Sequence, residues 1–161
     1  MEFKYLTNDF YVDYDITNYP EICRKIARPY TQTICSANGL LFAIPLRSSI
    51  EHDNVLWTNK DNGCGLDFSK AVLIIDKAKY IDEVSRPHIR PDEYKVLLGQ
   101  EYNVKTKMEK YIKDYKKAKK KPYALHNKKF CEYSTLQYFE EFIYSGIELS
   151  NQEVAPGKEP D

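Results

Sequence analysis

The hydrophobic pattern at the start of the chain predicts a short strand followed by a short helix. Residues 2–6 alternate weakly between polar and apolar side chains, which is typical of a strand with one buried face. Thr7 or Asn8 then stands where a helix cap is favoured, and the helix should run through Tyr14.

The clearest local signal is a β-hairpin centred on Asn38-Gly39. The flanking residues, 28–37 and 40–46, are rich in β-forming side chains. Asn-Gly suits the central positions of a type I′ turn, because both positions need a positive φ. Pro45 cannot donate a hydrogen bond to a neighbouring strand, so we expect the second strand to end there or to lie at a sheet edge.

After an apolar run at 71–75, which predicts a buried strand, the pattern becomes helical. Pro91-Asp92-Glu93 suits a helix start, since proline fits the first turn and acids favour the positive end of the helix dipole. An apolar stripe at helical spacing follows, with lysines opposite, and it ends at Lys121-Pro122. The stripe comprises Val104, Met108, Tyr111, Ile112, Tyr115 and Ala118.

Ser134 can cap a last helix over residues 135–144, with four apolar side chains facing inward: Leu136, Phe139, Phe142 and Ile143. The whole pattern predicts an α+β fold with a β-rich first half and a helical second half. We expect one domain over residues 1–146 and a flexible, acidic tail over 147–161.

Composition fits a small globular domain. Of 161 residues, 42% are hydrophobic, which is enough for a core and argues against disorder. No apolar run is long enough to span a membrane, and the first 30 residues lack a secretory signal, so a soluble, cytoplasmic protein is expected.

The four cysteines, at positions 23, 35, 64 and 131, form no C-x-x-C pair and have no histidine at zinc-type spacing. Free cysteines are often buried, so we interpret most of them as small core residues, with a catalytic Cys–His pair as the alternative.

Charge is distributed very unevenly. The net charge of the chain is zero, yet residues 105–129 contain eleven lysines and only two acids, Glu109 and Asp114. Lysines interleaved with Tyr111, Tyr115 and Tyr123 favour nucleic acid, because phosphates pair with lysine and unpaired bases stack on aromatic rings. The alternatives are an ordinary solvated helix face, or a membrane or partner surface.

Candidate chemistry follows the hairpin, where Arg47, Ser48, Ser49 and His52 occur within six residues. Ser48 and Glu51 match the S-x-x-E capping box, which would begin a helical turn whose backbone N–H groups bind an anion. Arginine would add a bidentate phosphate donor, and histidine a group that titrates near neutrality. The alternative is a plain helix cap beside a solvated histidine.

Signals for other chemistry are weak. Asp67-x-x-Lys70 and Pro91-Asp92-Glu93 are fragments of metal-nuclease patterns without partners, so no metal and no cofactor are expected. The chain has no P-loop, no G-x-G-x-x-G and no G-x-S-x-G motif.

Several segments, in order and spacing, resemble the toxins of type III toxin–antitoxin systems, the ToxN/AbiQ group and particularly its CptN/TenpN branch. The segments are Arg28-Pro29-Tyr30, Gly39, residues 42–49 (FAIPLRSS), residues 65–74 (GLDFSKAVLI) and residues 130–133 (FCEY). The resemblance implies a compact, twisted, mostly antiparallel sheet with helices packed around it.

The resemblance also implies a function. Members of this family are endoribonucleases that cut single-stranded cellular RNA without a metal and leave a 2′,3′-cyclic phosphate. They are inhibited by an RNA antitoxin of pseudoknot repeats, which they process and with which they form closed assemblies.

The same resemblance assigns site residues. Arg28 and the run Arg47-Ser48-Ser49 match functional positions, but the family's Thr-Ser-Pro-Lys pattern is absent here. His52 could take over the role of the missing lysine as general acid or base. Arg28 and Arg47 would stabilise phosphate charge, and Ser48 and Ser49 would bind the phosphate or hold His52.

Seven residues are predicted to bind RNA: Tyr30, Lys70, Lys113, Lys116, Lys117, Lys120 and Lys121. For Tyr30, stacking on a base and burial in the core remain open alternatives. The competing functional hypotheses are a non-catalytic RNA-binding module and a protein-binding regulator.

Overall fold

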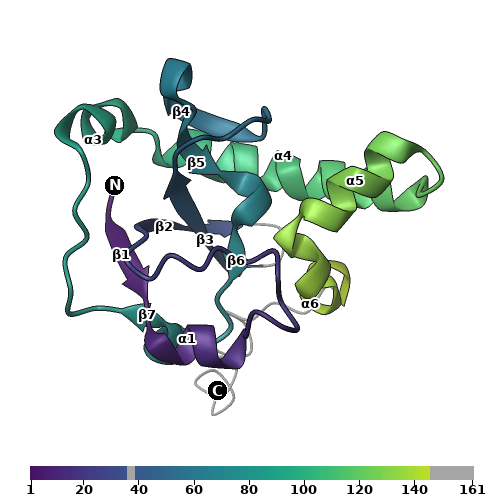
Figure 1. Cartoon of the computed structure of the whole chain (residues 1–161), viewed down its shortest axis with the longest axis horizontal. Helices are drawn as coiled ribbons and strands as arrows, with labels where there is room; N and C mark the ends of the chain where they lie inside the picture. Colours follow the sequence, from purple (N-terminus) through teal and green to yellow (C-terminus); the bar gives the residue numbers. More distant parts are fainter. Residues whose placement is uncertain (36–38, 146–161) are drawn as a thin grey trace, which may run out of the picture.

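A mostly antiparallel sheet forms the centre of the protein (Figure 1). The computed structural model describes residues 1–35 and 39–145. Within them the strand order is β4-β5-β3-β2-β1-β7, and β6 also pairs with β3. The strands are β1 (Phe3–Leu6), β2 (Tyr30–Cys35), β3 (Leu40–Arg47), β4 (Val55–Asn59), β5 (Cys64–Asp67), β6 (Val72–Leu73) and β7 (Ile81–Asp82).

Helices pack around this sheet, which confirms the predicted α+β class and antiparallel architecture. The α-helices are α1 (Asn8–Asp13), α2 (Lys77–Tyr80), α3 (Pro91–Leu97), α4 (Glu101–Lys120), α5 (Leu125–Tyr133) and α6 (Glu140–Ser145). Short 3-10 turns are η1 (Lys60–Asn62), η2 (Phe68–Lys70) and η3 (Thr135–Tyr138). Figure 1 shows α3 and the C-terminal end of α4 on opposite sides of the sheet.

The predicted hairpin is confirmed. Strands β2 and β3 pair antiparallel from Tyr30 opposite Pro45 to Cys35 opposite Leu40. Gly39 has a φ of 62°, the left-handed conformation that glycine adopts without a steric penalty. Asn38 lies outside the described residues, and with it the predicted turn type.

The prediction for Pro45 is wrong, because β3 continues to Arg47 in the middle of the sheet. Leu46 N donates to Pro29 O toward β2, so the nitrogen of the preceding residue, Pro45, faces the other side. There β3 changes partner: pairing with β6 involves Phe42 and Ala43, and pairing with β5 starts at Leu46. The proline nitrogen therefore faces the gap between two partner strands.

The second half of the chain forms helices largely where its apolar periodicity predicts them. Helix α3 begins at Pro91, and α4 buries most of the predicted stripe and ends before Lys121. The expected last helix is instead η3 and α6, with Ser134 capping η3. They separate at Phe139, which leaves the helical conformation with φ −123° and packs its buried ring 5.8 Å from that of Tyr14. Helix α5 and the β4–β5 hairpin were not predicted.

One hydrophobic core joins the two halves of the chain. It contains strand residues such as Phe42 and Leu66 together with Met108 and Tyr115 of α4. The hydroxyl of Thr135 donates to the carbonyls of Ser69 and Ala71, which ties η3 to η2. Within the described residues, no helix combines the length and apolar character needed to cross a membrane.

Candidate functional site

The loop from Ser48 to Asn54 is not the helical turn that the capping box predicts. Ser48 and Ser49 form a bend, with Ser49 at φ 58°, and no helix follows. The buried Ile50 donates its N–H to Gly63 O at 3.0 Å, and a Cβ on Gly63 would meet Ile50 N at 2.9 Å. This close contact holds the chain against the β4–β5 turn, so the expected anion site at a helix N-terminus does not form.

At the end of β5, a buried carboxylate organises the polar side chains of this region. Asp67 has no exposed surface, and Arg47 Nη1 donates to its Oδ2. The opposite oxygen, Oδ1, accepts from Ser69 N at 2.9 Å and from Ser69 Oγ at 2.6 Å. Burial acts to raise the pKa of Asp67, but hydrogen bonds from His52, Ser69 and Arg47 outweigh it and lower that pKa below its ordinary value.

His52 joins the same network, and both of its ring nitrogens are engaged. Nε2 lies 3.2 Å from Asp67 Oδ1 and 3.1 Å from Ser69 Oγ. Nδ1 lies 3.1 Å from Asn54 N, which can only donate. The hydrogen-bond pattern therefore places a proton on Nε2 and an acceptor lone pair on Nδ1. Neither nitrogen is left to face a substrate in this arrangement.

Asp67 and Ser69 were not among the candidates that the sequence suggested. A signal was present, since Asp67 stands between Leu66 and Phe68 in an otherwise apolar stretch, and a carboxylate in such a position is normally paired when buried. Its partners, however, come from β3 and from the loop after β3, and the sequence does not show that pairing.

Three of the predicted site residues line one small pocket, of about 150 Å³. Arg28, Arg47 and Ser48 contribute to it, together with residues from the segment before α3. We call this the arginine pocket; its polar lining residues are Lys25, Arg28, Arg47, Ser48, Cys64, His88, Arg90 and Glu93. Its positive side chains outnumber its single carboxylate, so the pocket favours an anion.

The two pocket arginines have unused donors. Arg28 Nη1 donates to Leu46 O at 3.1 Å, and Arg47 Nη1 is bound to Asp67. Yet the buried Nε atoms of both arginines have no hydrogen-bond partner within the part of the chain that the structure describes. A buried N–H without an acceptor is unfavourable, so each of the two arginines keeps an unsatisfied donor beside the pocket.

The structure separates Ser49 and His52 from these residues, since neither lines the arginine pocket. His52 instead contacts both oxygens of Asp67, and Asn54, two residues further along the chain, lines a second cavity of about 130 Å³ against α4. The network of Arg47, Asp67 and His52 thus runs from the arginine pocket toward α4.

Two of the predicted RNA-binding residues have internal roles. Tyr30 is fully buried, which raises the pKa of its phenol well above the ordinary value, so the structure favours the core alternative for this residue. Lys70 Nζ lies 2.8 Å from both Glu21 Oε1 and Tyr133 O, where it ties η2 to neighbouring segments.

The remaining predicted lysines lie along the second half of α4. Lys113, Lys117, Lys120 and Lys121 are exposed, and Lys116 Nζ sits 5.3 Å from the ring centre of Tyr144. We call these five lysines the lysine arm. In Figure 1 this half of α4 lies with α5 on the side of the sheet away from α3.

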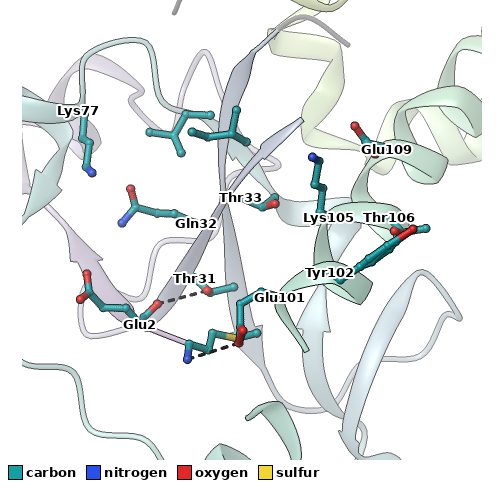
Figure 2. Close-up of a pocket in the computed structure, with 13 residues that line it drawn as sticks. Glu2, Thr31, Gln32, Thr33, Lys77, Glu101, Tyr102, Lys105, Thr106 and Glu109 are labelled. Atoms are coloured by element: carbon teal, nitrogen blue, oxygen red, sulfur yellow. Dashed lines mark hydrogen bonds and ion pairs between the residues drawn. The ribbon is translucent and has the colours of Figure 1, made fainter. Parts of the chain in front are cut away.

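A larger cavity, about 890 Å³, lies along the edge of β2 beyond the point where pairing with β1 stops (Figure 2). In Figure 2, Gln32 and Lys77 lie on one side of the strand, and Thr33, Lys105 and Tyr102 lie on the other. Its lining mixes lysines with glutamates and includes no histidine or cysteine. The arginine pocket is smaller but holds the more reactive set of side chains.

No protein-family model, curated protein or solved structure matches the chain. The resemblance to type III toxins therefore stays a prediction. Among residues 1–35 and 39–145, no three His, Cys, Asp or Glu side chains gather in a way that could hold a metal ion.

Proposed function

We propose that the chain is an endoribonuclease that cleaves RNA by attack of a 2′-hydroxyl on the adjacent phosphate, with that phosphate bound in the arginine pocket. The observation that carries the proposal is that Arg28, Arg47 and Ser48 line one pocket in which cationic side chains outnumber carboxylates. The pocket, about 150 Å³ in volume, has room for a phosphate group.

The reaction needs charge stabilisation and proton transfer. The O2′–P bond forms as the P–O5′ bond breaks, which gives a 2′,3′-cyclic phosphate and a 5′-hydroxyl end. Arg28 and Arg47 stabilise the negative charge that grows on the non-bridging oxygens, and Ser48 donates a hydrogen bond to the same group. No metal takes part in this scheme, as in the family that the sequence resembles.

In this proposal, Asp67 and His52 are positioning residues. Asp67 holds the guanidinium of Arg47, and His52 and Ser69 hold Asp67. The sequence-based hypothesis that His52 is the general acid or base requires its Nε2 to leave Asp67 and Ser69 first. A direct catalytic role for His52 therefore stays a prediction, and the positioning role needs no rearrangement.

The lysine arm supplies affinity for the RNA. Its exposed cations suit a phosphate backbone, and exposed Tyr123 and Tyr133 nearby on the chain offer rings for unpaired bases. By the resemblance, the partners are single-stranded cellular RNA and an antitoxin of pseudoknot repeats, assembled with the toxin into a closed complex in the cytoplasm.

The second candidate function is a non-catalytic RNA-binding module. The lysine arm favours it independently, because such a surface binds RNA without any reactive pocket. A binding module has no need for two arginines that line one pocket with Ser48.

The decisive experiment incubates the purified chain with mixed cellular RNA in excess EDTA and analyses the fragment ends. We expect 2′,3′-cyclic phosphate ends from the wild-type chain. Arg28→Gln should lower the rate by about 10²–10³, the usual effect of removing one donor to developing charge. Arg86→Gln, outside the pocket, is the matched control and should cleave like wild type.

Three results would redirect the proposal. Intact but tightly bound RNA would favour the binding module. Cleavage only after Mg²⁺ is restored would indicate a metal-dependent nuclease. Equal rates for Arg28→Gln and Arg86→Gln would remove the arginine pocket from the reaction.

A further inference from the structure

We infer that His88, in the segment between β7 and α3, is the general base that takes the proton from the attacking 2′-hydroxyl. The inference rests on the proposed function and adds a residue that the sequence patterns did not suggest. Its basis is the position of His88 in the arginine pocket, on the lining shared by Arg28, Arg47 and Ser48.

The other histidines are in unsuitable places. His52 has both ring nitrogens in the Asp67 network and does not line the pocket. His126 lies on α5, on the side of the sheet away from α3. Within the described residues, neither ring nitrogen of His88 has a hydrogen-bond partner, so both are open to a substrate.

The segment that carries His88 is well anchored. Pro87 and Pro91 restrict the backbone on either side, and Ile89 packs against the hydrophobic core. Arg90 pairs with Glu93 at 3.6 Å. The buried Glu93 in turn accepts from Thr58 Oγ1 of β4 at 2.5 Å. These contacts fasten the start of α3 to the sheet and keep His88 on the lining of the pocket.

The step balances as follows. Neutral His88 accepts the 2′-hydroxyl proton as the O2′–P bond forms, and the departing O5′ takes a proton from water. The imidazolium then returns its proton to solvent. A base placed in this way contributes about 10²–10⁴ in rate.

Charged and titratable groups surround His88 on several elements. Lys25 and Arg28 face the pocket from the segment before β2, Arg47 from β3, Cys64 from β5, and Arg90 and Glu93 from the start of α3. Arginines keep their charge across the whole working range, and histidine side chains change protonation between about pH 5 and 8. Cleavage that needs a neutral imidazole as base should therefore slow toward acid.

The test compares single-turnover cleavage of single-stranded RNA in EDTA by the wild-type chain, His88→Gln and the matched surface control His126→Gln. We expect His88→Gln to cleave about 10²–10⁴ slower, with an unchanged melting curve and nearly unchanged RNA affinity. Its residual rate should no longer fall toward acid, so the acidic limb of the pH–rate profile should be absent. Added imidazole should restore part of the activity of His88→Ala but not that of Arg28→Gln.

Each outcome is decisive. If wild type cleaves and His88→Gln keeps its rate and acidic limb, the inference is wrong and the proposed function stands. Loss of rate with the acidic limb intact, and no rescue by imidazole, would mean that His88 only shapes the pocket. If the wild-type chain itself does not cleave, the proposed function fails and the inference fails with it.

Discussion

The arginine pocket and the lysine arm are both basic, yet they hold their charges differently. In the pocket, Arg47 is fixed by a buried carboxylate and Arg28 by a backbone carbonyl. On the arm, Lys113, Lys117 and Lys120 point into solvent from one helix. The pocket therefore presents few donors in a set geometry, whereas the arm presents many mobile ones.

This contrast separates RNA affinity from catalytic rate, two properties that net charge alone does not distinguish. Mobile surface cations bind any phosphate backbone and are screened by salt. Fixed donors in a small pocket can act on charge that develops at one atom, because they do not have to reorganise during the reaction. Changes in the pocket should thus alter rate and fold stability, and changes in the arm should alter affinity and its salt dependence.

The largest expected effect comes from removing the centre of the pocket network. Asp67→Ala leaves the Arg47 guanidinium half-buried without its partner and should lower the free energy of unfolding by about 3–5 kcal/mol. Urea denaturation followed by circular dichroism measures it. The control Asp61→Ala changes an exposed carboxylate in η1 and should alter stability by less than about 0.5 kcal/mol. Equal effects of the two changes would show that Asp67 is not central to the network.

The next effect concerns the arm. Changing Lys117, Lys120 and Lys121 together to Gln should weaken RNA binding and reduce the slope of log affinity against log salt by up to about three. The rate at saturating RNA should stay the same. A matched triple change to Gln at the exposed Lys60, Lys77 and Lys95 provides the control, and an equal loss of slope there would contradict a dedicated arm.

The smallest effect is a pH dependence of stability. Because the pKa of Asp67 is lowered in the fold, the folded state binds this proton less readily than the unfolded chain. The contribution of ionised Asp67 to folding stability is complete above the ordinary carboxyl pKa. It is lost as the pH falls from about 5 through the lowered pKa. The stability difference between wild type and Asp67→Asn should therefore shrink between about pH 5 and pH 2.

Asp15, whose pKa is lowered by hydrogen bonds from Asn18 and which lies outside the Asp67 network, gives the comparison for this experiment. Asp15→Asn should produce a small difference from wild type at every pH. If the Asp67→Asn difference stayed constant on acidification, the network would not depend on the ionised carboxylate.

The sequence predicted the fold well wherever local pattern determines structure. The Asn-Gly hairpin, the capping Thr7 and the buried stripe of α4 all depend on residues close together in the chain. The β4–β5 hairpin was missed because β4 shows no clear alternation: only Val55 is buried, and the rest of the strand is half-exposed.

The candidate site could be predicted only in part. Arg28, Arg47 and Ser48 were named, and they do share a pocket. His88 was not named, and Asp67 was named only within a metal-nuclease fragment, because each is brought to the site by strand order and by the path of the chain before α3. The capping box failed for the same reason: Ile50 bonds to Gly63, a contact from outside its own segment.

The buried network also bears on how this site persists in evolution. Replacing a complete buried ionic cluster by apolar residues is often neutral or stabilising, whereas removing one member leaves a charge unpaired. Stability would rise only if all three members of this cluster changed together, namely Arg47, Asp67 and His52. Any single change would lower stability first. Selection for a folded chain alone is then enough to retain these three residues, whether or not they also serve a function.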